Sequence, residues 1–139
     1  MILLDTNVVS EPLRQAPDIR VVEWIDAQAL GTLFLSAITV VERRAGVALR
    51  PAGKRRAGLQ ESLETRVLPL FAGRVLPFHL GCIQAYADLM AKAPASGLAV
   101  ASADGYIAAI AAANGLSIAT RDAGPFEAAG AKVINPWLG

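Results

Sequence analysis

Short apolar segments alternate with helical patterns along this chain, and that alternation constrains its fold more than any other feature. The first segment, residues 2–4, reads Ile-Leu-Leu, which is typical of a strand buried on both faces in a parallel sheet. The other predicted strands are residues 33–35, 74–76, 117–119 and 132–134. Because helical patterns separate these strands, the sequence predicts a three-layer α/β/α domain with a mainly parallel sheet of roughly five strands.

Capping and helix-breaking residues mark the ends of the predicted helices. Asp18, Ser36 and Ser102 are residue types that cap helix N-termini, and Gly115 stands where a helix commonly ends in the left-handed conformation. Prolines follow several of the predicted C-termini, where they stop a helix from continuing. The predicted helices span residues 6–11, 19–29, 36–49, 53–71, 79–93 and 102–114.

Composition indicates a soluble protein with one domain, residues 1–139. The hydrophobic fraction of 54% comes largely from alanine. The longest apolar-looking stretch, 98–119, is interrupted by Asp104 and Asn114, so we expect no membrane span. The first residues lack the pattern of a signal peptide. A single cysteine, Cys82, excludes an internal disulfide framework and is expected to be a small buried side chain, so we expect a cytoplasmic protein.

The net charge of +1 does not indicate a class of partner, but one segment is strongly basic. Between residues 43 and 56 the chain has six basic residues and no acidic residue. Such a basic segment is either a solvated helix end and loop or a surface that binds the phosphates of a nucleic acid. The residues of this basic segment are Arg43, Arg44, Arg50, Lys54, Arg55 and Arg56.

Four acidic residues lie in positions that need an explanation. Asp5 and Asp122 directly follow predicted strands, and Asp104 lies in the first turn of a predicted helix above apolar residues. Each of these three has an ordinary alternative as a helix cap or a partner of the helix dipole. Glu42 lies in mid-helix and has no such alternative. Its neighbours on the same helix face are Ile38, Ala45, Gly46 and Leu49, so we expect it to project from an apolar face.

If the strands before these acids are neighbours, all four carboxylates meet at the carboxyl edge of the sheet, where α/β proteins bind ligands. Two carboxylates about 4 Å apart repel by roughly 4 kcal/mol at an effective dielectric constant near 20, so such a cluster needs protons or a cation. The chain has one histidine and one cysteine, which leaves oxygen as the ligand for a metal. Mg²⁺ or Mn²⁺ suits that ligand set and activates water for attack on a phosphodiester.

Four segments in this order resemble the PIN-domain ribonuclease toxins of VapBC toxin–antitoxin modules, particularly their FitB-like branch. The segments are MILLDTNVVSE, SAITVVERRAG, SADGYIAAIAAANG and IATRDAGPFEAAGAKVINPW. The resemblance covers nearly the whole chain. It implies a PIN fold and a metal-dependent endoribonuclease, in which a metal-activated water leaves a 5′-phosphate and a 3′-hydroxyl. The expected substrate is structured RNA such as tRNA or rRNA.

The resemblance also assigns roles to residues of this chain. Asn7 and Thr120 match polar positions expected to orient carboxylates, water or phosphate, and Arg121 is a candidate for phosphate contact. The basic segment is the other candidate surface for RNA. The acidic residues that match the ligands of Mg²⁺ or Mn²⁺ are Asp5, Glu42, Asp104 and Asp122.

Partners follow from the same resemblance. Such toxins are homodimers that a VapB-like antitoxin neutralises by wrapping them and inserting an arginine beside the acids; operator DNA is contacted through the antitoxin. Three positions depart from the usual pattern. His79 replaces an acid and is expected at a surface or cap position. Arg43 replaces a leucine and Ala45 an aromatic residue, which puts the fit of the antitoxin in question.

Two other functions remain to be weighed. One is a catalytically silent module that binds an antitoxin or RNA, which the departures near Glu42 favour and the retained acids oppose. The other is a phosphatase with an aspartate nucleophile after the first strand. That chemistry wants a second aspartate two residues later as general acid, whereas Asn7 occupies that position.

Overall fold

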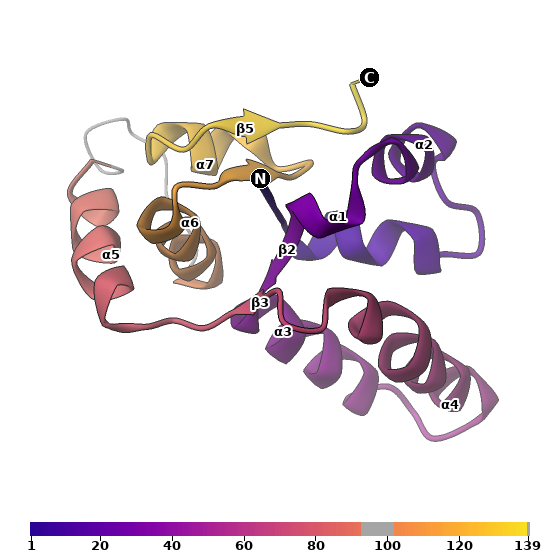
Figure 1. Cartoon of the computed structure of the whole chain (residues 1–139). Helices are drawn as coiled ribbons and strands as arrows, with labels where there is room; N and C mark the ends of the chain where they lie inside the picture. The colour runs from indigo at the N-terminus through magenta and orange to yellow at the C-terminus, as the bar shows by residue number, and fades with distance from the viewer. Residues whose placement is uncertain (93–101, 139) are drawn as a thin grey trace.

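A computed structural model describes residues 1–92 and 102–138, without the side chain of Ser102. Five parallel strands form one sheet in the order β3-β2-β1-β4-β5, with β1 at its centre (Figure 1). Leu3 of β1 is in register with Phe34 on one side and with Ile118 on the other. The strands are β1 (Ile2–Leu4), β2 (Leu33–Ser36), β3 (Val75–Leu76), β4 (Ser117–Ala119) and β5 (Val133–Ile134). The predicted parallel five-stranded sheet is therefore confirmed.

Seven helices lie around the sheet in the described part of the chain. Two predicted caps are confirmed: the side chain of Asp18 accepts from the backbone N of Arg20, and that of Ser36 accepts from Thr39. Residue 102 begins a helix, but its capping and the predicted helix end at residue 93 lie outside what is described. The helices are α1 (Thr6–Ser10), α2 (Ile19–Ala27), α3 (Ala37–Ala48), α4 (Lys54–Glu61), α5 (Leu80–Lys92), α6 (Ser102–Asn114) and α7 (Ala123–Ala128).

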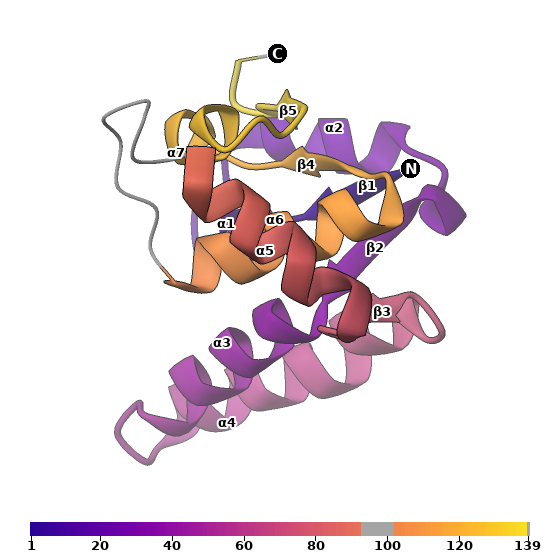
Figure 2. The same ribbon diagram turned by 90° about the vertical axis from the view of Figure 1, so that its left-hand side faces the viewer.

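The two faces of the sheet have separate cores because successive side chains of β1 point to opposite faces. Leu3 packs in a core with residues of α5, α6 and α7, which include the buried Cys82. Leu4 packs in the other core with α1, α2 and Trp137. Figure 2 shows α5 and α6 stacked over the first face. The predicted three-layer architecture and the buried cysteine are both confirmed.

The segment 53–71 differs from the single regular helix predicted for it. After α4 the backbone widens into a π-helical turn at Ser62–Val67 and then tightens into a 3-10 turn at Leu68–Phe71. Pro69 gives the reason, because its ring removes a backbone donor and clashes with the preceding turn of an α-helix. Helices α3 and α4 run side by side and project from the sheet as an arm, which both views show (Figures 1 and 2).

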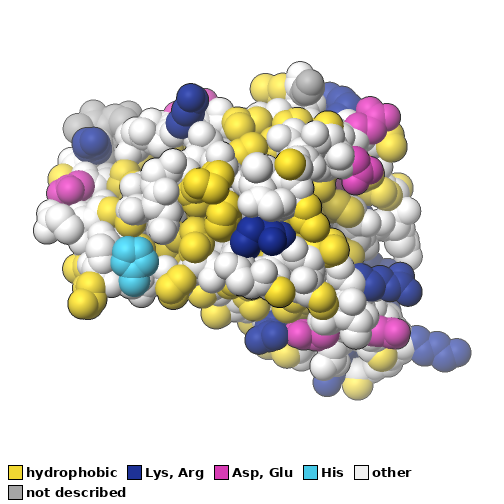
Figure 3. Space-filling view, in the orientation of Figure 1, with side chains coloured by type: hydrophobic (Ala, Val, Ile, Leu, Met, Phe, Trp, Pro, Cys, Tyr) yellow, Lys and Arg dark blue, Asp and Glu magenta, His cyan; other side chains and the backbone are white. Residues whose placement is uncertain are grey.

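The amino ends of the strands face the viewer in Figure 1. Figure 3 gives the same view in space-filling form, and its acidic side chains lie at the margins of this face. Within residues 1–92 and 102–138, no helix is both long and apolar enough to cross a bilayer.

Candidate active site

A cavity of about 460 Å³ opens at the carboxyl edge of the sheet, and the structure brings all four predicted acids to it. Asp5 follows β1, Asp122 follows β4, and Glu42 and Asp104 come from α3 and α6. The convergence predicted from strand order therefore occurs. The residues that line the cavity are Asp5, Thr6, Asn7, Ser10, Glu11, Arg14, Glu42, Asp104, Arg121, Asp122 and Trp137.

Asp5 is both a helix cap and part of the acidic cluster. It is 4% exposed, and its Oδ1 accepts a 2.8 Å hydrogen bond from the backbone N of Thr6 at the start of α1. Its Oδ2 accepts from the hydroxyl of Thr120 at 2.8 Å and from the amide of Asn7 at 3.4 Å. The two polar residues predicted beside the acids therefore hold this carboxylate in place.

Asp122 occupies the N-cap position of α7, but its side chain makes no capping hydrogen bond there. Its backbone N donates instead to the hydroxyl of Thr120 at 3.0 Å. The neighbouring backbone N of Arg121 donates to Oδ1 of Asn7 at 3.3 Å. Thr120 and Asn7 thus tie the turn after β4 to the turn after β1, while the Asp122 carboxylate is exposed at the cavity.

The predicted setting of Glu42 is wrong, although its membership of the site is as expected. Glu42 is exposed, and Leu49 on the same helix face is 85% exposed, so this face is not part of the core. Helix α3 buries the face that carries Thr39 and Val47. Because that face packs inward, Glu42 is turned toward solvent and the cavity, where its Oε1 accepts a 2.8 Å hydrogen bond from the hydroxyl of Thr6.

Thr6, Thr39 and Ser36 form a chain of hydroxyls that the sequence analysis missed. The hydroxyl oxygens of Thr6 and Thr39 are 3.2 Å apart, and those of Thr39 and Ser36 are also 3.2 Å apart. A hydroxyl donates one proton, and the Glu42 carboxylate only accepts. Thr6 therefore donates to Glu42, Thr39 to Thr6, and Ser36 to Thr39. Fully buried Ser36 and Thr39 thereby orient an exposed carboxylate.

The charges of the four acids act on one another across the cavity. Burial raises the pKa of Asp104 to about 6, with further contributions from the charges of Asp5, Asp122 and Glu42. Burial likewise raises the pKa of Asp5, which the hydrogen bond from Thr120 partly opposes. A raised carboxyl pKa means that the charged form is poorly compensated, which is the condition that a cation relieves.

The donor set fits a hard divalent cation by its chemistry, because all four side chains offer carboxylate oxygens. As the side chains stand, no three acidic, histidine or cysteine residues within 1–92 and 102–138 are grouped closely enough to hold a metal ion. Glu42 and Asp122 are exposed at the same cavity that the buried Asp5 and the half-buried Asp104 line. The residues that could hold a metal are Asp5, Glu42, Asp104 and Asp122.

Glu11 and Arg14 also line the cavity, and sequence reasoning did not identify them. Glu11 is 2% exposed, and its carboxylate accepts from Nη1 of Arg14 at 2.7 and 3.1 Å. The separation of three residues between an acid and an arginine was the signal available in the sequence. On another wall, the guanidinium of Arg121 lies 5.2 Å from the ring centre of Trp137, within cation–π range.

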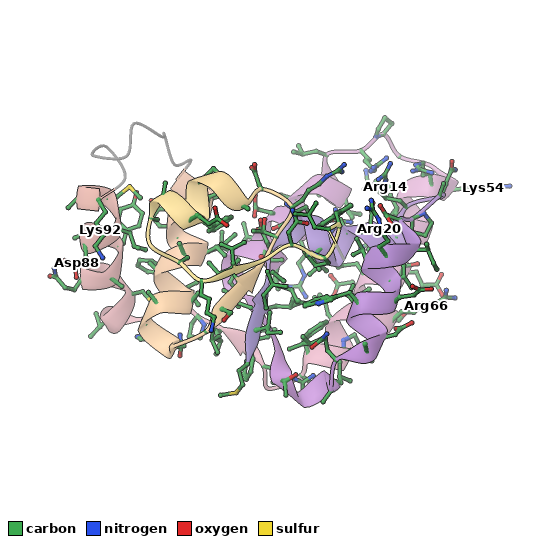
Figure 4. All side chains as sticks on the ribbon, turned by 90° about the horizontal axis from the view of Figure 1, so that it is seen from above. Arg14, Arg20, Lys54, Arg66, Asp88 and Lys92 are labelled. Carbon is green, nitrogen blue, oxygen red and sulfur yellow. The ribbon has the colours of Figure 1, made fainter. Side chains whose placement is uncertain are left out.

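The basic segment lies on the arm formed by α3 and α4. Lys54 and Arg55 are exposed, and Figure 4 labels Lys54 at the outer end of the arm. Arg44 pairs with Glu64, with nitrogen–oxygen distances of 2.8 and 3.0 Å. Arg43 is half-buried, its Nε has no hydrogen-bond partner in the described part of the chain, and burial lowers its pKa. Arg43 is therefore less accessible to RNA than the exposed members of the basic segment.

His79 is exposed and acts as a cap, as predicted. Its Nδ1 accepts a 3.0 Å hydrogen bond from the backbone N of Gly81 in the first turn of α5. Ala45, the other departure from the expected pattern, is exposed on α3.

Comparisons with known proteins agree with this architecture. A family model described as "PIN domain" matches residues 2–132. The chain is 60% identical over 137 residues to "VapC ribonuclease Y4jK" of Sinorhizobium fredii, covering 99% of this chain and 98% of that protein. It is 54% identical over 137 residues to "Toxin FitB" of Neisseria gonorrhoeae, covering 99% of each.

A solved structure described as "Structure of FitAB bound to IR36 DNA fragment" contains a chain with the same fold, with a TM-score of 0.94 and 52% sequence identity. The match covers 99% of this chain and 96% of that one. The sequence and the fold thus agree over nearly their full length, and this chain belongs to the PIN-domain family, among the VapC and FitB toxins.

Proposed function

We propose that this chain is the toxin of a type II toxin–antitoxin module and a divalent-metal-dependent endoribonuclease, working in the cytoplasm as one domain, residues 1–139. The observation that carries this proposal is the convergence of four carboxylates on one cavity, where burial of Asp104 and then the charges of the other three raise its pKa to about 6. Carboxylates placed to repel one another indicate a site built for a cation. The family to which the chain belongs supports the same chemistry.

Asp5, Glu42, Asp104 and Asp122 would hold Mg²⁺ or Mn²⁺. A divalent ion bound there supplies positive charge for a phosphodiester and activates water for its hydrolysis. The chain's own residues supply the positions: Thr120 and Asn7 fix the carboxylate of Asp5, and the hydroxyl of Thr6 fixes that of Glu42.

The proposed substrate is structured RNA such as tRNA or rRNA. Arg121 lies at the cavity, close enough to contact a bound phosphate chain. Lys54 and Arg55 are exposed on the arm, and Arg56 is half-buried beside them, so the outer end of the arm offers a second cationic surface. Arg44 is paired with Glu64, so it would have to break that ion pair in order to bind a phosphate of the RNA. The arm would therefore contact RNA away from the cleaved bond.

The proposed partners are a VapB-like antitoxin and a second copy of the chain in a homodimer. An arginine of the antitoxin would suit the acidic cavity, because a guanidinium bridges carboxylates in place of a metal ion. The structure of FitAB on DNA supports an assembly in which operator DNA is contacted through the antitoxin.

Sequencing of RNA 5′ ends after pulsed expression tests this function. Wild-type protein should produce a defined cleavage site with a 5′-phosphate, and Asp5→Asn should abolish it because Asp5 is the buried member of the acidic set. Asp88→Asn is the matched control, because Asp88 is an exposed carboxylate of α5 that does not line the cavity. Equal cleavage by Asp5→Asn would overturn the assignment, and no cleavage by the wild type would favour the catalytically silent module.

A further inference from the structure

Arg14 is held in a fixed position at the wall of the cavity. A 3-10 turn at Glu11–Leu13, with Pro12 near its start, brings the backbone N of Arg14 to 3.2 Å from the carbonyl oxygen of Glu11. The same turn brings Nη1 of Arg14 to 2.7 and 3.1 Å from the two carboxylate oxygens of Glu11. The guanidinium is thus anchored at one nitrogen, Nη1.

The burial of the two partners is very unequal. The side chain of Glu11 is 3% exposed, and that of Arg14 is 60% exposed. A buried carboxylate is costly unless it is paired, so Glu11 serves to hold the arginine rather than to meet solvent. A guanidinium has five N–H donors, and both contacts with Glu11 use Nη1. Within the described residues, Nε and Nη2 of Arg14 have no hydrogen-bond partner, so they remain available to a ligand in the cavity.

The negative charge of the cavity favours a fixed guanidinium, such as that of Arg14, for binding a polyanionic ligand. Five carboxylates line it, against two guanidinium groups, those of Arg14 and Arg121. A bound divalent ion offsets the carboxylates around the reacting phosphate, but the adjacent phosphates of an RNA chain each bring another negative charge into the same acidic region. The fork of a guanidinium matches phosphate oxygens in two-point hydrogen bonds. Arg121, whose guanidinium lies over the ring of Trp137, is one of the two cations that the cavity offers for this purpose, and Arg14 is the other.

We propose that Arg14 binds a phosphate next to the one that is cleaved, with Glu11 as the residue that positions it. The ligand is the phosphodiester backbone of an RNA strand, and the inference rests on the proposed ribonuclease function. Arg14 adds a contact for substrate at the cavity itself, separate from the basic arm and separate from the acids that would hold the metal.

Arg20 provides a matched control in the same part of the molecule. Its side chain is 57% exposed and is paired with Asp18 through Nε at 3.1 Å and Nη2 at 2.7 Å, but it does not line the cavity. Figure 4 labels both arginines, Arg14 and Arg20, beside α2. Replacing either one removes one positive charge from an arginine that is more than half exposed and is paired with an acid, so non-specific electrostatic effects on RNA binding should be similar.

The test measures binding of a short fluorescein-labelled single-stranded oligoribonucleotide of mixed sequence by fluorescence anisotropy, at several KCl concentrations. All proteins carry Asp104→Asn so that the probe stays intact. Arg14→Gln should weaken binding about tenfold, as expected for a charge-assisted hydrogen bond. It should also reduce the slope of log K against log salt by about 0.7, the value for one lost phosphate contact on a single strand. Arg20→Gln should change neither quantity.

A second variant protects the test against misfolding, since Arg14→Gln leaves Glu11 buried without its partner. The double variant Glu11→Gln/Arg14→Gln removes both charges and should show the same loss of binding and of salt slope. If Arg14→Gln and the double variant bind the probe as Arg20→Gln does, Arg14 does not contact the RNA and the inference is overturned. If the parent protein neither binds the probe nor, with Asp104 restored, cleaves RNA, the proposed function itself fails.

Discussion

Replacing Thr120 with valine tests whether one buried hydroxyl holds the acidic site together. Valine has nearly the same shape, so the change removes the hydroxyl of a residue that is 0% exposed without opening a cavity. Three hydrogen bonds are lost: the one donated to Asp5 at 2.8 Å, the one accepted from the backbone N of Asp122 at 3.0 Å, and a longer one accepted from the side-chain amide of Asn7 at 3.4 Å. The carboxylate of Asp5 then keeps weaker support in a buried position.

The expected loss of stability follows from those three bonds. A hydrogen bond to a charged group contributes about 1.5 to 3 kcal/mol and one between neutral groups about 1 kcal/mol. The loss of one bond of the first kind and two of the second should therefore lower the free energy of unfolding of Thr120→Val by about 3.5 to 5 kcal/mol. Thr120→Ser keeps the hydroxyl and loses a methyl group, which costs about 1 kcal/mol. Urea denaturation of metal-free protein at neutral pH measures the free energy of unfolding of both variants, and the comparison holds where the m-value is unchanged.

The pH dependence of this loss gives a second check. The hydroxyl of Thr120 stabilises the charged form of Asp5, so Thr120→Val raises the pKa of Asp5 in the folded state further above its ordinary value. A raised folded pKa of an acid means that stability is lost as the pH rises through it. The deficit of Thr120→Val relative to Thr120→Ser should therefore be largest at neutral pH and shrink in acid. A valine variant as stable as the serine variant at neutral pH would refute the reasoning.

Two further predictions concern the other acids. Thr6→Val should weaken Mn²⁺ binding about tenfold, because Glu42 loses its 2.8 Å hydrogen bond and with it the partner that orients a metal ligand. Thr6→Ser keeps the hydroxyl and should bind Mn²⁺ as the wild type does. Calorimetry measures the binding, and a melting curve for each variant separates this effect from unfolding. In metal-free protein, the pKa of Asp104 raised to about 6 means that stability is greatest below the ordinary value of 3.8 and declines as the pH rises through about 6. Thermal unfolding across this range should show the decline in the wild type and a weaker one in Asp104→Asn; equal profiles would contradict the assigned cause.

Local signals in the sequence were enough to predict most of the fold. Buried parallel strands and capped helices are specified by residues close together in the chain, such as Asp18 before α2 and Ser36 before α3. One exception is α7 (Ala123–Ala128), which the predicted helices did not include. Another is the segment after α4, where Pro69 lies within an apparently continuous helical pattern. Periodicity shows that a helix is amphipathic, but it does not show how a proline distorts the turns beside it.

The candidate site was predictable in its acids but not in the setting of each acid. Helix α3 has apolar residues on two faces, and the sequence does not reveal which one is buried. The structure buries the face with Val47 and exposes the face with Leu49. The hydrogen bond between Thr6 and Glu42 joins residues that are 36 positions apart, so it depends on the packing of α1 against α3. The spacing of residues along the chain does not predict such a contact.

Titration of metal-stripped protein with Mn²⁺ in a calorimeter tests the central claim, that the four carboxylates form one metal centre. The wild type should bind Mn²⁺, and both Asp5→Asn and Asp104→Asn should weaken binding by about a hundredfold or more, since each removes a ligand charge from a shared site. Glu127 is an exposed carboxylate of α7 that does not line the cavity, so Glu127→Gln should bind Mn²⁺ as the wild type does. Wild-type protein that binds no Mn²⁺, or an Asp104→Asn variant that binds it equally well, would contradict the account.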